Sequence, residues 1–316
     1  MYADNKVAGE EKYLYGPVPS RRLGRSLGVD IVPLKVCTLD CIYCQLGKTT
    51  QKTIQRRQYV PPSAVLAEIE HRLAKGLMAD FITISGSGEP TLNSALGEIV
   101  AGIKNLTEIP VAILTNGTLL YEKDVRADCA KADVVLPSLD AGDERTFRKI
   151  NRPYPDISIE KLISGLSSFR DEFAGRIWLE VFLVEDVNTD AAAIAKISEA
   201  IKRIRPDKIH LNTAVRPTAE KNVRRVDVEK LNAIAAQLGP RCEVVADFSP
   251  QRCTEHVVNK AQDVLSVLKR RPCSLDDICS GLGISQAEAL NYITHFRQQG
   301  LVHSEQKGDV TFFRAD

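Results

Sequence analysis

The sequence predicts an α/β protein: a partial (β/α)6-type barrel followed by a small winged-helix domain. Three observations predict this fold. Short β-branched apolar runs alternate with helix-periodic segments, a pattern typical of parallel strands joined by right-handed crossovers. The 316 residues are enough for two domains, and 44% hydrophobic residues are enough for a sizeable core. The C-terminal residues 255–316 then change to short helical segments with a two-stranded end.

The expected barrel strands are short runs rich in β-branched and apolar residues. They are Leu27–Leu34, Phe81–Ser85, Val111–Thr115, Val134–Leu139, Ile177–Val184, Lys208–Thr213 and Cys242–Ala246. Between them, Ser63, Asn93 and Asp190 stand before apolar residues at helical spacing and mark expected helix starts. Functional groups of such barrels lie in loops at the C-terminal ends of the strands, so we expect the site there.

The C-terminal segment is expected to form a separate winged-helix domain. Its expected helices and strands are Val257–Lys269, Leu275–Gly281, Gln286–Gln298, Leu301–Ser304 and Val310–Arg314. The boundary is placed near Gln251–Glu255, which divides the chain into 1–254 and 255–316. Basic and acidic residues balance in this segment, whereas a DNA reader usually shows a basic footprint. Protein contact, a structural cap and nucleic-acid contact all remain open as its role.

Composition excludes several classes of protein. A formal net charge of +1 argues against a general polyanion binder. No apolar run reaches the ~18 residues of a membrane span, and Met1–Lys6 lacks the apolar region of a secretory signal. We therefore expect a cytoplasmic protein without a membrane partner, in which the eight cysteines are thiols rather than disulfides.

One tight cysteine cluster, Cys37, Cys41 and Cys44, directly follows the first expected strand. A structural zinc site takes four ligands, but only three cysteines stand here, and the closest histidine is His71. Three thiolates without a fourth ligand suit a [4Fe–4S] cluster that keeps one iron open. An open iron implies an added ligand, and therefore chemistry.

The C-x3-C-x2-C spacing, with Tyr43 just before the last cysteine, resembles the radical S-adenosylmethionine (SAM) superfamily. The resemblance implies that SAM binds the open iron through its amino and carboxylate groups. An electron from a donor such as flavodoxin or ferredoxin would then cleave SAM to a 5′-deoxyadenosyl radical, which abstracts hydrogen from a substrate. A zinc site or a redox-sensing cluster is the alternative interpretation.

The same resemblance implies SAM contacts at successive strand ends. Ser85-Gly86-Ser87-Gly88-Glu89-Pro90 resembles the motif that holds the SAM amino group, and Thr115-Asn116-Gly117 resembles a turn near SAM. Further matches imply contacts to the SAM carboxylate, ribose and adenine. The residues expected to contact the cofactor are Tyr43, Ser85, Gly86, Gly88, Glu89, Thr115, Asn116, Ser138, Arg152, Glu180 and Val184, with Asn188 beside the adenine.

Each of these residues also has a structural interpretation. The glycine-rich segment is also an ordinary tight βα turn. Asp140 is as well placed to cap the next helix as to bind a ligand. Arg152 fits a surface position. Glu180 interrupts an apolar strand, where a carboxylate is costly unless it is paired, so a buried ion pair is its alternative.

Substrate contacts are expected at His210, Asn212 and Arg216, which lie in or just after the sixth expected strand. Basic residues also gather near the N-terminal part of the chain, where they could grip phosphates or an anionic small substrate, or form a solvated face. They are Arg21, Arg22, Arg25, Lys48, Lys52, Arg56 and Arg57.

The stretch Tyr15–Gly28 makes the chain similar to radical SAM proteins related to the wyosine-base (4-demethylwyosine) synthase. That enzyme carries a second cluster on N-terminal cysteines, but no cysteine precedes Cys37 here. The prediction is therefore a radical SAM enzyme whose substrate, a small molecule, RNA or protein, stays open. The alternatives are an activase that places a glycyl radical on a partner enzyme and an iron–sulfur sensor that regulates transcription.

Overall fold

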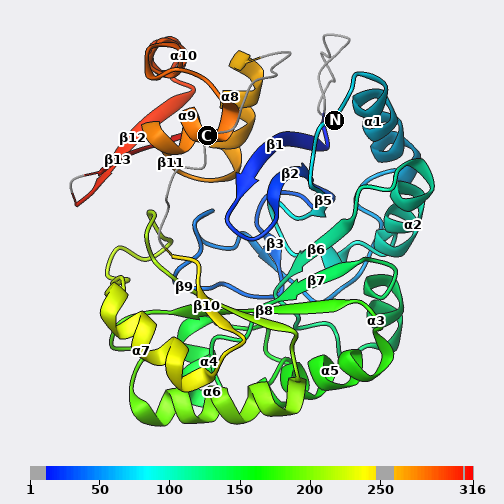
Figure 1. Ribbon diagram of the computed structural model, residues 1–316, viewed down its shortest axis with the longest axis vertical. Helices are drawn as coiled ribbons and strands as arrows, with labels where there is room; N and C mark the ends of the chain where they lie inside the picture. The colour runs from blue at the N-terminus through cyan, green and yellow to red at the C-terminus, as the bar shows by residue number, and fades with distance from the viewer. Residues whose placement is uncertain (1–11, 247–259, 309, 316) are drawn as a thin grey trace.

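An eight-stranded sheet dominates the computed structural model, which describes residues 12–246, 260–308 and 310–315 (Figure 1). Its strand order is β1-β2-β5-β6-β7-β8-β9-β10. β1 pairs antiparallel with β2, and every other pair is parallel. The strands are β1 (Leu14–Ser20), β2 (Gly24–Val29), β5 (Phe81–Ile84), β6 (Val111–Thr115), β7 (Val134–Pro137), β8 (Arg176–Leu183), β9 (Lys208–Thr213) and β10 (Cys242–Val244).

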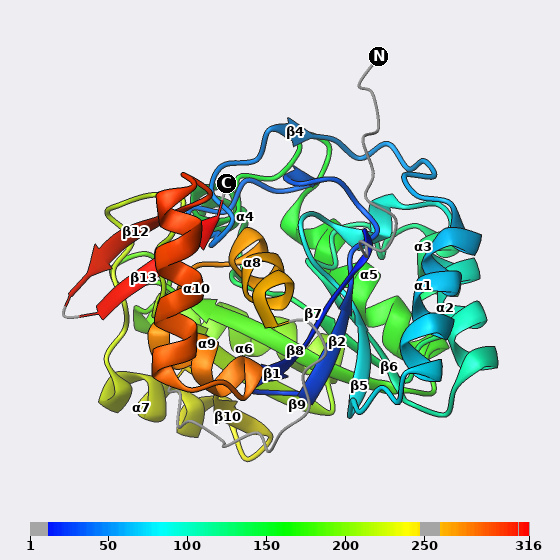
Figure 2. The ribbon, with the colours of Figure 1, turned by 90° about the horizontal axis from the view of Figure 1, so that it is seen from above.

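Helices follow the parallel strands and cover the outer face of the sheet (Figures 1 and 2). They are α1 (Pro62–Ala74), the 3-10 turn η1 (Pro90–Leu92), α2 (Leu96–Leu106), α3 (Lys123–Cys129), α4 (Glu144–Ile150), α5 (Ile159–Glu172), α6 (Ala191–Ile204) and α7 (Val228–Leu238). α6 begins as expected at Asp190, whose side chain accepts from the Ala193 amide. The sheet and helices together bear out the α/β class and the parallel arrangement.

A small apolar cluster, called the plug below, packs on the inner face of the sheet. Leu23, in the β1–β2 turn, packs with residues of β6, β7 and β8. The plug consists of Leu23, Ala112, Val134, Leu136 and Trp178. The β1–β2 turn therefore closes one end of the barrel, and a cavity remains above it.

Within the eight-stranded sheet, β1 is the strand that the sequence analysis missed. Its segment, Leu14–Ser20, contains two prolines and a glycine, and proline within a run argues against a central strand. β1 lies at the edge of the sheet, where proline is tolerated. The predicted strand Leu27–Leu34 begins and ends earlier in the structure. Here β2 spans Gly24–Val29, and the residues after Val29 lead to the cysteine loop.

The C-terminal segment has a separate core and packs on β1. It contains α8 (Lys260–Arg270), α9 (Leu275–Leu282) and α10 (Gln286–Gln298), with strands β11 (Cys273–Ser274), β12 (Val302–Lys307) and β13 (Val310–Ala315). The strands form an antiparallel sheet in the order β11-β13-β12. Val18 of β1 packs against this core. The winged-helix class stays a prediction, and the expected boundary at Gln251–Glu255 lies outside the described residues.

None of the helices in the described ranges is long and apolar enough to cross a membrane.

Candidate functional site

The three clustered cysteines lie in a loop whose two ends are held together. Cys37 ends the short strand β3 (Val36–Cys37), which pairs in parallel with β4 (Gln51–Lys52). All cysteines in the described part of the chain are free thiols. The covalent pairing that would exclude a metal cluster is therefore absent from this loop.

Each of the three sulfurs faces one nitrogen donor from a different part of the chain. Lys35 Nζ lies 3.0 Å from the Cys44 sulfur. Asn151 Nδ2 lies 3.4 Å from the Cys41 sulfur, and Asn116 Nδ2 lies 3.5 Å from the Cys37 sulfur. Such donors are typical around sulfurs that carry negative charge, because they offset that charge inside the protein.

The thiols fit a cluster better than a single metal ion. Burial raises the pKa of the Cys37 thiol to about 12 and that of Cys41 well above its ordinary value, so the metal-free thiols hold their protons. Among the described residues, no three His, Cys, Asp or Glu side chains are grouped to hold one metal ion. Zinc needs four donors around a single atom, whereas an iron–sulfur cluster takes one sulfur on each of several irons.

Glu89 joins the glycine-rich segment to the Thr115–Asn116 turn. Its buried carboxylate accepts hydrogen bonds from Thr115 Oγ1 at 2.6 Å and from the Asn116 amide at 2.7 Å. Thr91 adds its hydroxyl at 2.6 Å and its amide at 3.0 Å. Burial raises the pKa of Glu89, while these donors lower it. The structure therefore brings the two motifs together, with Glu89 as their organising acceptor.

The glycines of this segment permit close approach to the cysteine loop. A Cβ at Gly88 would lie 2.2 Å from the Val36 carbonyl oxygen, next to Cys37. Gly86 has a φ of +124°, and a Cβ there would lie 2.5 Å from the carboxyl carbon of Asp30. Both positions therefore require glycine for steric reasons, and the turn that they form lies directly beside the cysteines.

Asp140 differs from the expectation that it caps the following helix. The N-cap of α4 is Asp143, whose side chain accepts from the Thr146 amide. Asp140 is buried and instead accepts from the Tyr43 hydroxyl, from Asn151 Nδ2 at 2.7 Å and from the Phe182 amide at 2.8 Å. Since Asn151 also reaches the Cys41 sulfur, Asp140 positions one of the sulfur donors.

A cavity of about 380 Å³ lies between the cysteine loop and the β1–β2 turn. Of the residues predicted to bind cofactor, metal or substrate, its lining contains Cys41, Tyr43, Cys44, Ser85, Gly86, Glu180, Asn212 and Arg216. The Tyr43 ring stacks on Phe182 with centroids 3.9 Å apart, which gives the wall an aromatic face. Residues from both ends of the sheet line this one cavity, so the sheet curves around it as a partial barrel.

Glu180 lines this cavity as half of an ion pair. Its carboxylate pairs with Arg22 of the β1–β2 turn, and Asn212 Nδ2 donates to it at 3.2 Å. Burial lowers the pKa of Arg22 to about 10, with Arg21 adding repulsion. The ion-pair alternative is therefore realised, and Glu180 still faces the cavity.

Other predicted residues lie away from the cavity lining. His210 is on the same face of β9 as Asn212, but its Nε2 pairs with Glu243 at 2.9 Å. Arg152 is 40% exposed and bonds Glu220 at 2.7 Å. Val184 is buried in an apolar cluster, and Asn188 uses its amide to hold backbone groups of Asp140, Phe182 and Val184. Ser138 forms an isolated bridge with Glu180, outside the lining.

The predicted basic group is also dispersed. Only Arg21 and Arg22 reach the cavity. Arg25 pairs with Asp80, and Arg56 pairs with Asp128.

The sequence analysis missed the contribution of α8 to the site. Val267, Arg270 and Arg271, at and just after the end of this helix, line the cavity together with Tyr15 of β1. The Arg270 guanidinium lies over the Tyr15 ring, 4.3 Å from its centroid. The only signal was the run Lys269-Arg270-Arg271, and nothing in its spacing says that the helix end faces the barrel.

Solved structures define the class of fold. SuiB from Streptococcus suis, bound to the precursor peptide SuiA, matches with a TM-score of 0.53 at 15% identity, covering 69% of this chain and 48% of SuiB. A radical SAM methyltransferase from Sphaerobacter thermophilus matches with a TM-score of 0.50 at 18% identity, covering 69% of this chain and 65% of that one. At these identities the likeness concerns the fold alone.

The model of the radical SAM superfamily matches residues 31–197, and the chain belongs to this superfamily of enzymes. Its members use a [4Fe–4S] cluster and SAM. A UPF0026 protein from Methanocaldococcus jannaschii is 38% identical over 224 residues, 70% of each chain. A protein named GTPase Obg from Brachyspira hyodysenteriae is 34% identical over 93% of this chain, which spans 44% of that protein's length.

Proposed function

We propose that this protein is a radical SAM enzyme that abstracts hydrogen from a substrate enclosed in the barrel cavity. One observation carries the proposal: Cys41 and Cys44 line the same cavity as Ser85, Gly86 and Glu180. A cluster on the cysteine loop would therefore face a cavity that is also lined by groups of the SAM motifs. When bound, the cluster and SAM supply one-electron cleavage of SAM to a 5′-deoxyadenosyl radical.

The chain's own residues would divide the work as follows. Cys37, Cys41 and Cys44 hold the cluster, while Lys35, Asn116 and Asn151 donate to their sulfurs. Ser85 and Gly86 would hold the amino end of SAM. Glu89 keeps the neighbouring turn in place rather than reaching SAM itself, since its four hydrogen bonds join Thr91, Thr115 and Asn116.

The aromatic and apolar part of the cavity lining has a chemical purpose in this proposal. Tyr43, Phe182, Leu46 and Val267 line the cavity and limit the access of water and other reactants. A primary alkyl radical reacts with most C–H bonds, so a shielded site keeps it from side reactions. A cavity of about 380 Å³ lies within the range of small-molecule sites, and in this proposal it would hold SAM together with a small substrate.

A distant relative is compatible with this proposal. A probable GTP 3′,8-cyclase from Saccharolobus islandicus is 29% identical over 192 residues, 60% of this chain. Its name describes a reaction on a small nucleotide.

The test is anaerobic reconstitution with iron and sulfide, reduction, and chromatographic detection of 5′-deoxyadenosine from SAM. The wild type should form it, and Cys41→Ala should not. Cys279→Ala, in the C-terminal core, is the matched control and should keep the activity. Absence of both SAM binding and 5′-deoxyadenosine in the reconstituted wild type would refute the proposal. DNA binding that changes on cluster oxidation, without SAM cleavage, would support the sensor alternative instead.

A further inference from the structure

The cavity carries an unusual concentration of arginine. Arg21 and Arg22 come from the β1–β2 turn, Arg216 from the loop after β9, and Arg270 and Arg271 from the end of α8. Glu180 is the sole carboxylate among the described residues of the lining, and it is paired with Arg22. The described lining therefore holds five arginines and one carboxylate.

The carboxylates that interact with Arg216 and Arg270 are not among the residues that line the cavity. Arg216 Nη2 is 3.0 Å from Asp277 Oδ1, in a pair that is 4% and 9% exposed. Burial raises the pKa of this carboxyl group, but the positive charges of Arg216 and Arg271 help to hold it below its ordinary value. Arg270 lies 3.6 Å from Asp30, and its buried Nε has no hydrogen-bond partner.

An arginine-rich lining of this kind favours an anionic ligand. Arginine is the side chain best suited to bind phosphate, through paired N–H donors that match the phosphate oxygens. The SAM carboxylate supplies a single negative charge. A phosphate monoester carries almost two negative charges at neutral pH, together with three acceptor oxygens.

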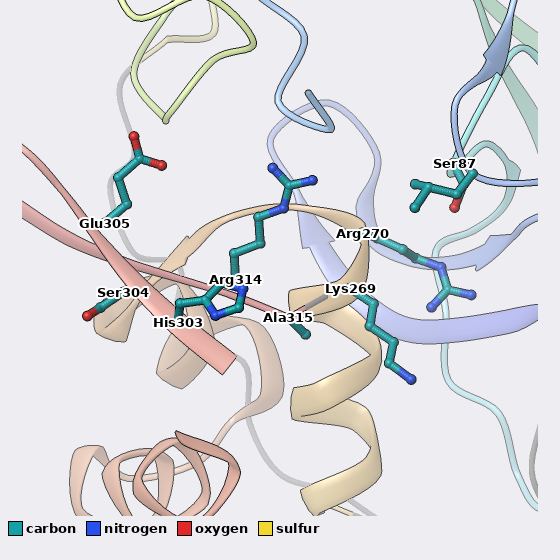
Figure 3. A pocket seen from close by; sticks show the side chains of 9 residues that line it. Ser87, Lys269, Arg270, His303, Ser304, Glu305, Arg314 and Ala315 are labelled. Atoms are coloured by element: carbon teal, nitrogen blue, oxygen red, sulfur yellow. The ribbon is translucent and has the colours of Figure 1, made fainter. Parts of the chain in front are cut away.

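A second hollow of the same character adjoins the cavity. It has a volume of about 740 Å³ and lies between the barrel loops and the β12–β13 hairpin (Figure 3). Lys269, Arg270 and Arg314 line it, with Glu305 as the only carboxylate in the described lining. Arg270 belongs to both hollows, so the approach to the cavity is also lined by cations, as expected for steering an anion.

We propose that the cavity binds a small-molecule substrate through a phosphate group, held by Arg21, Arg216, Arg270 and Arg271, and that the C-terminal segment completes this site. The inference rests on the proposed function and names the class of its substrate. It also assigns a role to the C-terminal segment, which supplies Arg270 at the end of α8 and Arg271 just after it.

The test measures binding of inorganic pyrophosphate to the reconstituted, SAM-loaded protein by calorimetry. The wild type should show saturable binding at one site. Arg271→Gln and Arg270→Gln should weaken it by roughly 10- to 100-fold, the effect of losing a charged hydrogen bond. Arg271→Lys should recover part of the loss. The control is Arg297→Gln, an exposed arginine of α10, which should bind as the wild type does.

Several results would overturn the inference. It fails if the wild type does not bind pyrophosphate, or if Arg297→Gln weakens binding as much as Arg271→Gln. Equal binding of citrate at matched ionic strength would show a general anion site without phosphate preference. Tighter binding of an RNA oligonucleotide through the same arginines would replace the small molecule by RNA. Unchanged thermal unfolding of the variants excludes detachment of the C-terminal segment as the cause.

The two proposals fail separately in this experiment, because 5′-deoxyadenosine is measured in the same preparation. Its formation without pyrophosphate binding overturns only the phosphate site. Pyrophosphate binding without its formation overturns only the proposed function.

Discussion

Acidification from pH 7 to pH 5 is expected to destabilise the barrel through one buried histidine, His210. Its side chain is 1% exposed, bonds Glu243 at 2.9 Å and meets the edge of the Trp178 ring. Its Nδ1 has no hydrogen-bond partner. Burial, with repulsion from Arg22, lowers the pKa of His210 from 6.5 to about 4.

The sign and size of the effect follow from this pKa. Between pH 6.5 and 4 the unfolded chain binds a proton at His210 that the folded protein does not. The stabilisation is therefore complete above pH 6.5 and is lost progressively as the pH falls toward 4. Between pH 7 and pH 5 the free energy of unfolding should fall by about 2 kcal/mol on account of this residue.

The assay is urea unfolding at both pH values, followed by the fluorescence of Trp178, the single tryptophan of the chain. His210→Gln removes the titrating group. Its free energy of unfolding should therefore fall by about 2 kcal/mol less than that of the wild type between pH 7 and pH 5. His71→Gln, at an exposed position of α1, is the control and should behave as the wild type does. An equal loss in the wild type and in His210→Gln would refute the reasoning.

Two further predictions concern buried contacts of the site. Asp277→Asn leaves Arg216 buried beside a neutral partner, so the free energy of unfolding should fall by about 3 kcal/mol in urea denaturation. Asp276→Asn, at the exposed neighbour, should cost far less, and equal effects would contradict the buried pair. Lys35→Met removes the cationic donor 3.0 Å from the Cys44 sulfur. The reduction potential of the cluster, titrated by electron paramagnetic resonance, should become more negative by about 40 mV for a differential of ~1 kcal/mol. Lys48→Met should leave it unchanged, and a shift there of similar size would point to general charge instead.

The strand–helix alternation and the cysteine spacing were readable from sequence because both are local. Val111–Thr115 and Lys208–Thr213 form strands with the predicted bounds. Asp190 caps α6 as predicted, since a cap acts within three residues. β1 was missed because its prolines are tolerated only at an edge, and edge position is a property of the whole sheet.

Predictions about individual site residues depended on long-range partners. Asp140 and Asp143 are both acidic residues before the same helix, and only the fold shows that Asp143 caps it while Asp140 joins Tyr43, Asn151 and Phe182. His210 and Asn212 share one face of β9, yet only Asn212 lines the cavity. The difference arises because depth along the barrel depends on how the strands pair.

By itself, the sequence determined the class of this protein. The spacing of the three cysteines after a strand and the alternation of strand and helix patterns are both local features of the chain. Only the tertiary structure decided which charges meet. It paired Arg22 with Glu180 and placed one nitrogen donor beside each cysteine sulfur. It also brought Arg270 and Arg271 of the C-terminal segment into the lining of the cavity. The physical reason is that burial and pairing energies depend on distances between segments far apart in the chain, which local patterns do not encode.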